Sequence, residues 1–167
     1  MRLTFALCLL AAPALAQEPP VAGVLTFIAT GAKDGDGIVL GGRRGPTSVI
    51  GGVELRLQGV AAPEDRRGAP RTPEGRAATA ALDAMVAGAL VTCHLDGEVA
   101  SGSRATAVCH AMVEGAWTEL GAEMIRRGFA RDCPAYSLSR YADEERAAVA
   151  AGSRLAEVYE MPSYCVP

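Results

Sequence analysis

Apolar and polar residues alternate between Val49 and Val60, and this period of two predicts a half-buried β-strand. Val53, Leu55 and Leu57 would face one side of the strand, and Glu54, Arg56 and Gln58 the other. Short apolar runs predict further strands over 21–29, 38–40, 90–95 and 105–113. A turn over 33–37 and a loop over 41–46 separate the first three strands.

Three segments carry the signals of an α-helix. The first has Thr72 as its cap and Pro73 at its first position, and it ends before Gly88. The second is expected over Glu119–Arg127, capped by Thr118, and the third begins at Ser139. The apolar positions expected to face the body are Ala78, Leu82, Met85 and Val86 in the first helix, Leu120, Met124 and Ile125 in the second, and Ala148, Ala151 and Leu155 in the third.

The order of elements indicates the fold. Three strands, a helix, two strands and two helices predict an α+β domain with a five-stranded Greek-key β-barrel, as in OB-folds, and three helices. An α+β domain of another kind is the alternative.

The start of the chain resembles an export signal. Met1-Arg2 is basic, residues 3–10 are apolar, and Ala14-Leu15-Ala16 matches the small-residue cleavage pattern. The apolar run is too short to span a bilayer. We therefore expect residues 1–16 to be a cleaved signal peptide and 17–167 to be a single domain, periplasmic or secreted and free of the membrane.

Four cysteines would remain after cleavage: Cys93, Cys109, Cys133 and Cys165. An even number in an exported protein indicates disulfides, and four cysteines allow three pairings. A hairpin centred on Ser101 would place Cys93 directly opposite Cys109, within bridging distance. Cys133 would then pair with Cys165. Buried free thiols are the alternative.

The charge of the chain limits how it could bind nucleic acid. Its formal net charge is −3, which does not fit a general nucleic-acid binder. Aromatic residues make up 5% of the sequence, so a broad base-stacking surface is not expected. Any phosphate binding would therefore be local. A basic stretch of Arg66, Arg67, Arg71 and Arg76 could collect a polyanion or form a solvated face.

Residues suited to phosphodiester cleavage follow one another along the first half of the chain. Asp36 lies in the Asp34-Gly35-Asp36 turn, Arg56 on the polar face of its strand, and Glu64 behind Pro63. An arginine binds phosphate oxygens bidentately, a glutamate can take a proton from water, and an aspartate can bind a hard cation.

These motifs, in this order, resemble the staphylococcal nuclease (thermonuclease-like) family over most of 21–155. The resemblance rests on Asp34-Gly35-Asp36, on Arg56-Leu57 continuing to Ala62-Pro63-Glu64, on Gly102-Ser103-Arg104, and on Arg127-Gly128-Phe129-Ala130. It implies an OB-fold hydrolase that cleaves DNA and RNA with calcium. Arg56 and Arg104 would bind the phosphate, Glu64 would be the general base, and Asp36 with the Ala62 carbonyl would bind Ca²⁺. We expect a monomer.

Three positions depart from the family pattern. Ala61 stands where the family usually has a calcium-binding aspartate, and a methyl group cannot ligate a cation. Gly37 replaces a threonine near the metal, and Gly102-Ser103 replaces a tyrosine-glycine pair. Two hypotheses follow: an exported, calcium-assisted nuclease, or a catalytically decayed OB-fold module that binds nucleic acid or a protein partner.

Overall fold

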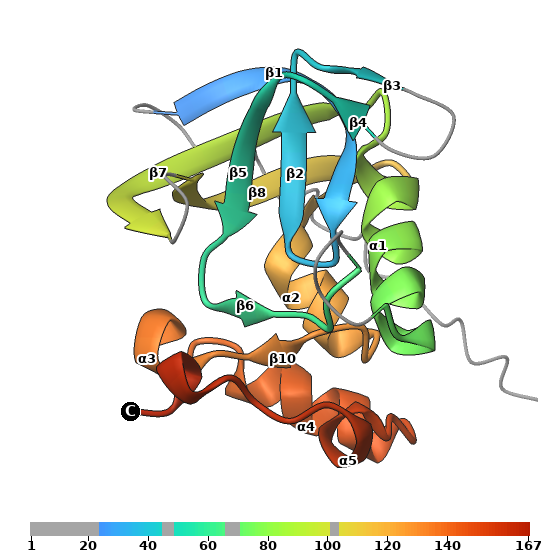
Figure 1. Cartoon of the computed structure of the whole chain (residues 1–167), viewed down its shortest axis with the longest axis vertical. Coiled ribbons are helices and arrows are strands. Elements are labelled where there is room, and N and C mark those ends of the chain that lie inside the picture. The colour runs from blue at the N-terminus through green and yellow to red at the C-terminus, as the bar shows by residue number, and fades with distance from the viewer. Residues whose placement is uncertain (1–23, 45–48, 66–70, 101–103) are drawn as a thin grey trace, which may run out of the picture.

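The computed structural model describes residues 24–44, 49–65, 71–100 and 104–167 (Figure 1). The strands are β1 (Val24–Asp34), β2 (Gly37–Leu40), β3 (Arg43–Arg44), β4 (Val49–Ile50), β5 (Val53–Leu57), β6 (Val60–Ala61), β7 (Leu90–Ala100), β8 (Arg104–Val113), β9 (Ala116–Glu119) and β10 (Arg131–Asp132). The helices are α1 (Pro73–Val86), α2 (Leu120–Arg126), α3 (Pro134–Ser137), α4 (Ala142–Ala150), α5 (Leu155–Val158) and a 3₁₀ turn, η1 (Ser163–Cys165).

Five strands form a closed barrel in the order β1-β2-β5-β8-β7, with β7 returning to β1. All neighbours are antiparallel except β5 and β8, whose parallel pairing closes the ring. β9 extends the sheet beyond β8, and β10 pairs with β6 in a separate ribbon. This confirms the predicted α+β fold with an OB-like barrel, and three of its helices have seven or more residues.

The barrel interior contains the residues that alternation assigned to it. Leu55 and Leu57 are buried, whereas Arg56 between them is on the outer face. Val53 was also predicted to face inward, but it is 62% exposed, because β5 begins there, after two glycines that turn the chain. The predicted stripes of α1 and α2 are buried in the same core.

Several predicted boundaries differ from the structure. The predicted strand 49–60 is three short strands, β4, β5 and β6, separated at Gly51-Gly52 and at Gly59, all of which have positive φ. Positive φ is a conformation that glycine adopts at little cost, so the chain bends there. Arg43–Arg44, placed in a loop, pairs as β3 with β4.

The predicted start of the first helix is correct, whereas the predicted starts of the other two helices are not. Thr72 caps α1 as expected, since its hydroxyl accepts a hydrogen bond from the Gly75 amide at 3.0 Å. Thr118, however, does not cap α2: it lies in β9, and Glu119 occupies the cap position, where its side chain accepts no hydrogen bond from the first turn of the helix. The predicted third helix is divided, with α4 beginning at Ala142 and Leu155 in the separate α5. Ala151, expected to be buried, is exposed.

Both predicted disulfides are present. Cys93 and Cys109 are direct cross-strand partners in β7 and β8, with Cα atoms 4.0 Å apart, inside the barrel core. Cys133 and Cys165 join the start of α3 to η1, 32 residues further along the chain. In the chain-entropy view each bridge contributes about 3–4 kcal/mol. Figure 1 shows β10, α3, α4 and α5 together at one end of the barrel, and with η1 they form the C-terminal layer to which the second bridge belongs.

The predicted signal peptide, residues 1–16, lies outside the described residues, as do Arg66, Arg67, Gly102 and Ser103. Within the described part of the chain, no helix is both long and apolar enough to cross a membrane.

Candidate active site

The site lies between the barrel and the C-terminal layer, where the β1–β2 turn points toward β6 and β10 (Figure 1). Asp34 ends β1 and Asp36 lies in the turn, and the two are only 4% and 5% exposed. Gly35 between them packs so closely that an added Cβ would lie 2.7 Å from Ala62 and 2.6 Å from Ala78. The turn is therefore seated against the barrel and α1, with two carboxylates turned inward.

Arg56 contacts this turn directly. It is opposite Gly37 in the β2–β5 pairing, and its Nη2 donates to Asp36 Oδ2 at 2.6 Å. Asp36 Oδ2 also accepts a hydrogen bond from the Ala62 amide at 3.4 Å. Burial alone would lower the pKa of Arg56, but the charges of Asp36 and Tyr164 outweigh it, and the pKa is raised. Arg56 therefore keeps its positive charge, and the ion pair with Asp36 holds its side chain in place.

Arg104 approaches the same turn from β8. Its Nη1 lies 3.8 Å from Asp34 Oδ2, and both side chains are nearly buried. The structure therefore brings Arg56, Arg104 and Asp36, three of the predicted site residues, to one end of the barrel. It adds Asp34, which was part of the sequence motif but had been assigned no role.

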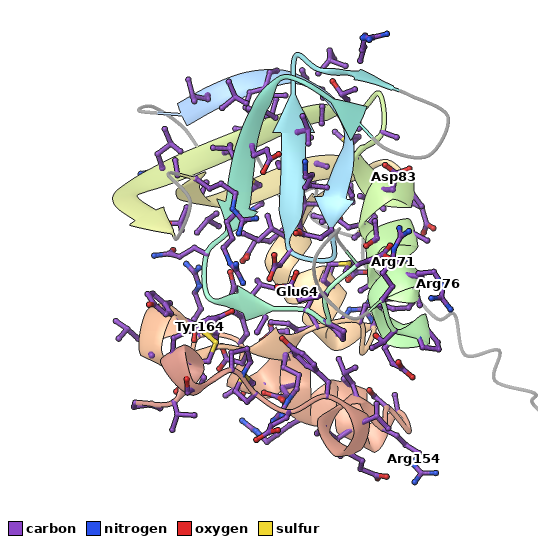
Figure 2. All side chains as sticks on the ribbon, viewed as in Figure 1. Glu64, Arg71, Arg76, Asp83, Arg154 and Tyr164 are labelled. Atoms are coloured by element: carbon purple, nitrogen blue, oxygen red, sulfur yellow. A yellow bond between two sulfur atoms is a disulfide. The ribbon has the colours of Figure 1, made fainter. Side chains whose placement is uncertain are left out.

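Glu64 follows Pro63 in the segment between β6 and α1. This segment runs tightly against the helix start, since a Cβ on Gly75 would lie 2.3 Å from the Glu64 carbonyl oxygen. Glu64 lines a cavity of about 190 Å³ together with Pro63, Thr72, Glu74, Val158 and Tyr159. Figure 2 shows Glu64 in the centre of the molecule, between the barrel and the C-terminal layer.

Tyr159 lines the same cavity as Glu64. Its pKa is raised, first by burial and then by the charges of Tyr164, Asp36 and Glu64. Glu64 follows Ala62 by two positions, and the Ala62 amide donates to Asp36 Oδ2 at 3.4 Å, so the chain itself places Glu64 near the turn.

The carboxylates of the turn are suited to a cation. Burial, reinforced by the charge of Asp34, raises the pKa of Asp36 to about 7, even though Arg56 and the Ala62 amide oppose the shift. Asp34 Oδ1 is buried and has no hydrogen-bond partner among the described residues. Two adjacent buried carboxylates, one with an unused oxygen, fit a hard cation such as Ca²⁺.

The protein supplies few ligands beyond these two. No group of three or more His, Cys, Asp or Glu side chains suited to a metal occurs among the described residues. The methyl group of Ala61 is fully buried against Cys133 and Cys165, with Tyr159 and Met161 at the edge. At the position where the family resemblance predicts a carboxylate, the structure therefore has a methyl group packed against the C-terminal layer. The Ala62 carbonyl stays a predicted ligand.

The basic stretch is only partly described. Arg71 and Arg76 lie beside the start of α1 in Figure 2, and Arg71 pairs with Asp65 at 2.7 Å. Arg76 donates to the Arg71 carbonyl at 3.5 Å, on the surface. Both arginines are solvent-exposed, as expected of a solvated face.

Two tyrosines of the site were not predicted. Tyr159 and Tyr164 come from the C-terminal layer and reach Glu64 and Arg56 from far along the chain. The cysteine pairing was the available signal, because a Cys133–Cys165 bridge places the residues beside Cys165 close to the body.

No family model matches this sequence, and no curated protein matches it either. The proposal below therefore rests on the motifs and on the geometry of the site.

Proposed function

We propose that this protein is an exported, calcium-assisted phosphodiesterase of the thermonuclease-like family that hydrolyses DNA or RNA. The observation that carries the proposal is the convergence of Arg56, Arg104 and the Asp34–Asp36 turn at one end of an OB-like barrel, with Glu64 two residues beyond Ala62, whose amide donates to Asp36. The faces and loops of such barrels are common binding sites for oligonucleotides. The predicted signal peptide and the two disulfides support export.

The roles follow from the chemistry of phosphodiester hydrolysis. Attack by water builds negative charge on the phosphoryl oxygens, and the guanidinium groups of Arg56 and Arg104 stabilise that charge. Glu64 accepts the proton of the attacking water, one ester P–O bond breaks as the new P–O bond forms, and the departing oxygen takes a proton from solvent. Asp34, Asp36 and the Ala62 carbonyl would hold Ca²⁺, which supplies further positive charge near the phosphate when bound.

The buried ion pairs hold the arginines in place before substrate arrives. An arginine has five N–H donors, so Arg56 can keep one bond to Asp36 and present others to a phosphate. Preorganised donors avoid the cost of ordering a long side chain during the reaction.

A decayed binding module is the second candidate, and Ala61 is the observation that favours it. Without a carboxylate at this position the site has fewer charged ligands, and calcium affinity decreases as the number of charged ligands decreases. Such a module would bind single-stranded nucleic acid or a protein partner at the barrel end without cleaving anything.

A nuclease assay separates the two candidates. Single-stranded DNA and RNA would be incubated with the protein while Ca²⁺ is raised from chelator to ~10 mM, the range of weak extracellular sites. Glu64→Gln, which keeps the size of the side chain, and Arg104→Lys, which keeps the charge, would be purified in parallel to exclude contaminating nuclease. We expect calcium-dependent cleavage that falls by about 10²-fold or more in Glu64→Gln.

The outcomes of this assay are distinct. Cleavage that survives Glu64→Gln would come from a contaminant or from another base, and it would overturn the proposed roles. Absence of cleavage at every calcium concentration, combined with oligonucleotide binding, would establish the binding module instead.

A further inference from the structure

The C-terminal segment reaches the candidate site and is fixed there. η1 contacts α3, and the Cys133–Cys165 bridge joins the two. Tyr164 precedes Cys165 directly, so the disulfide holds its backbone in place. Figure 2 shows Tyr164 at the edge of the region between the barrel and the C-terminal layer.

Tyr164 contacts Arg56 with both its ring and its hydroxyl. The hydroxyl oxygen accepts a hydrogen bond from Arg56 Nη2 at 3.4 Å, and the Arg56 Cζ lies 6.0 Å from the ring centroid. The same Nη2 donates to Asp36, so the guanidinium group is held between a carboxylate and a phenol. Cation–π contacts at this distance are attractive but modest.

The Tyr164 ring is itself supported. Tyr136, at the middle of α3, meets it edge to face, with centroids 6.3 Å apart and planes at 67°. Tyr164 is nevertheless 50% exposed, whereas the Arg56 side chain is 14% exposed. A half-exposed aromatic ring fixed by a disulfide beside a buried arginine has little to contribute to the core, so its position calls for another role.

We propose that Tyr164 is a positioning residue for Arg56, and that the Cys133–Cys165 bridge holds it in that position. The contact with Tyr164 matters more for the orientation of Arg56 when Asp36 binds a cation, because the Asp36 carboxylate then has fewer lone pairs to accept hydrogen bonds from Arg56. Tyr164 then keeps the guanidinium group oriented toward the phosphate. The effect of Tyr164 on phosphate binding rests on the proposed function, whereas its effect on the orientation of Arg56 does not.

The first test concerns the free protein. NMR of the full chain labelled with ¹⁵N-arginine would follow the guanidinium signals of Arg56, which report how freely this group rotates. Tyr164→Phe removes the hydroxyl and keeps the ring and the disulfide. We expect faster rotation of Arg56 in this variant, and no change in Tyr136→Phe, which loses the same atoms from the other ring of the pair.

The second test measures binding of a single-stranded DNA oligonucleotide in chelator, where no calcium-dependent cleavage occurs. Tyr164→Phe should weaken binding by about threefold, the low end of the net contribution of a hydrogen bond, because this bond is long. The same substitution in an Arg56→Ala background should have no effect, because the residue through which it acts is gone. The double variant Cys133→Ser/Cys165→Ser should reproduce the loss seen in Tyr164→Phe.

The results can be told apart from those of the nuclease assay. Unchanged Arg56 rotation in Tyr164→Phe, or an equal loss of binding in both Arg56 backgrounds, would overturn the positioning role even if the protein cleaves DNA. Tighter binding or faster cleavage in Tyr164→Phe would overturn it too, since Tyr164 would then obstruct Arg56. Altered rotation in a protein without nuclease activity would support the positioning role and refute only the enzyme proposal.

Discussion

Ala61→Asp restores the carboxylate that the family pattern would place here, and its effect can be estimated from the structure. Ala61 is fully buried, with Cys133 and Cys165 as its buried neighbours. A buried polar group without a partner costs about 1–3 kcal/mol, and overpacking adds about 1–3 kcal/mol. We therefore expect the variant to lose roughly 2–6 kcal/mol of unfolding free energy in chelator.

Calcium should recover part of this loss. If the new carboxylate reaches a cation held by Asp34 and Asp36, the variant gains stability from binding that the unfolded chain does not share. At a calcium concentration of 100 times Kd this gain is about 2.7 kcal/mol. Denaturant titrations followed by Trp117 fluorescence, in chelator and in calcium, would measure both terms. Ala61→Asn is the matched control, because it has the same size without the charge.

Two results would refute this reasoning. An Asp variant as stable as the native chain in chelator would mean that residue 61 is not packed against the disulfide. Equal calcium stabilisation of the Asp and Asn variants would mean that this position does not point to a cation site.

Three further predictions concern the turn and the helix beside it. The pKa of Asp36 is raised to about 7 from 3.8, so between these pH values the folded protein binds more protons than the unfolded chain. The unfolding free energy of the protein in chelator should therefore fall by roughly 2–4 kcal/mol as pH rises from 4 to above 7. Asp36→Asn should flatten this dependence of stability on pH, measured by denaturation. A profile in native protein that rises with pH instead would contradict this. Gly35→Ala, whose Cβ would crowd Ala62 and Ala78, should cost about 1–3 kcal/mol in thermal melts, and a neutral effect would show that the turn can move. Thr72→Ala should cost about 1 kcal/mol by the same assay, while Thr72→Ser, which keeps the hydroxyl, should cost less; equal losses would rule out the cap.

The barrel could be predicted because its signals are local. Alternation placed Leu55 and Leu57 inside and Arg56 outside, and counting from the hairpin centre paired Cys93 with Cys109. The breaks at Gly51-Gly52 and Gly59 were missed because glycine in an apolar run is compatible with both a strand and a bend.

The cap of α2 was misassigned for a similar reason. Thr118 has a strong preference for cap positions, but the pairing of β8 with β9 continues through Glu119 and keeps Thr118 in the strand. Sheet pairing therefore overrode local preference.

The candidate site also contains residues that the sequence could identify and one that it could not. Arg56, Arg104, Asp36 and Glu64 belong to motifs that can be read along the sequence. The structure brings the first three to one end of the barrel and places Glu64 between the barrel and the C-terminal layer (Figure 2). Tyr164 could not be assigned, because its contact with Arg56 spans 108 positions of sequence. Such a contact depends on the packing of the whole C-terminal layer.

The methyl group at position 61 and the C-terminal bridge are physically compatible with each other, whereas a carboxylate and the bridge are not. A carboxylate at this position would lie against Cys133 and Cys165 in a small apolar cluster, where its charge would be poorly solvated. A methyl group allows the bridge to pack, and the bridge brings Tyr164 to Arg56. If phosphate binds at this site, its binding should therefore depend more on the orientation of Arg56, and less on calcium, than in a site with a carboxylate at position 61.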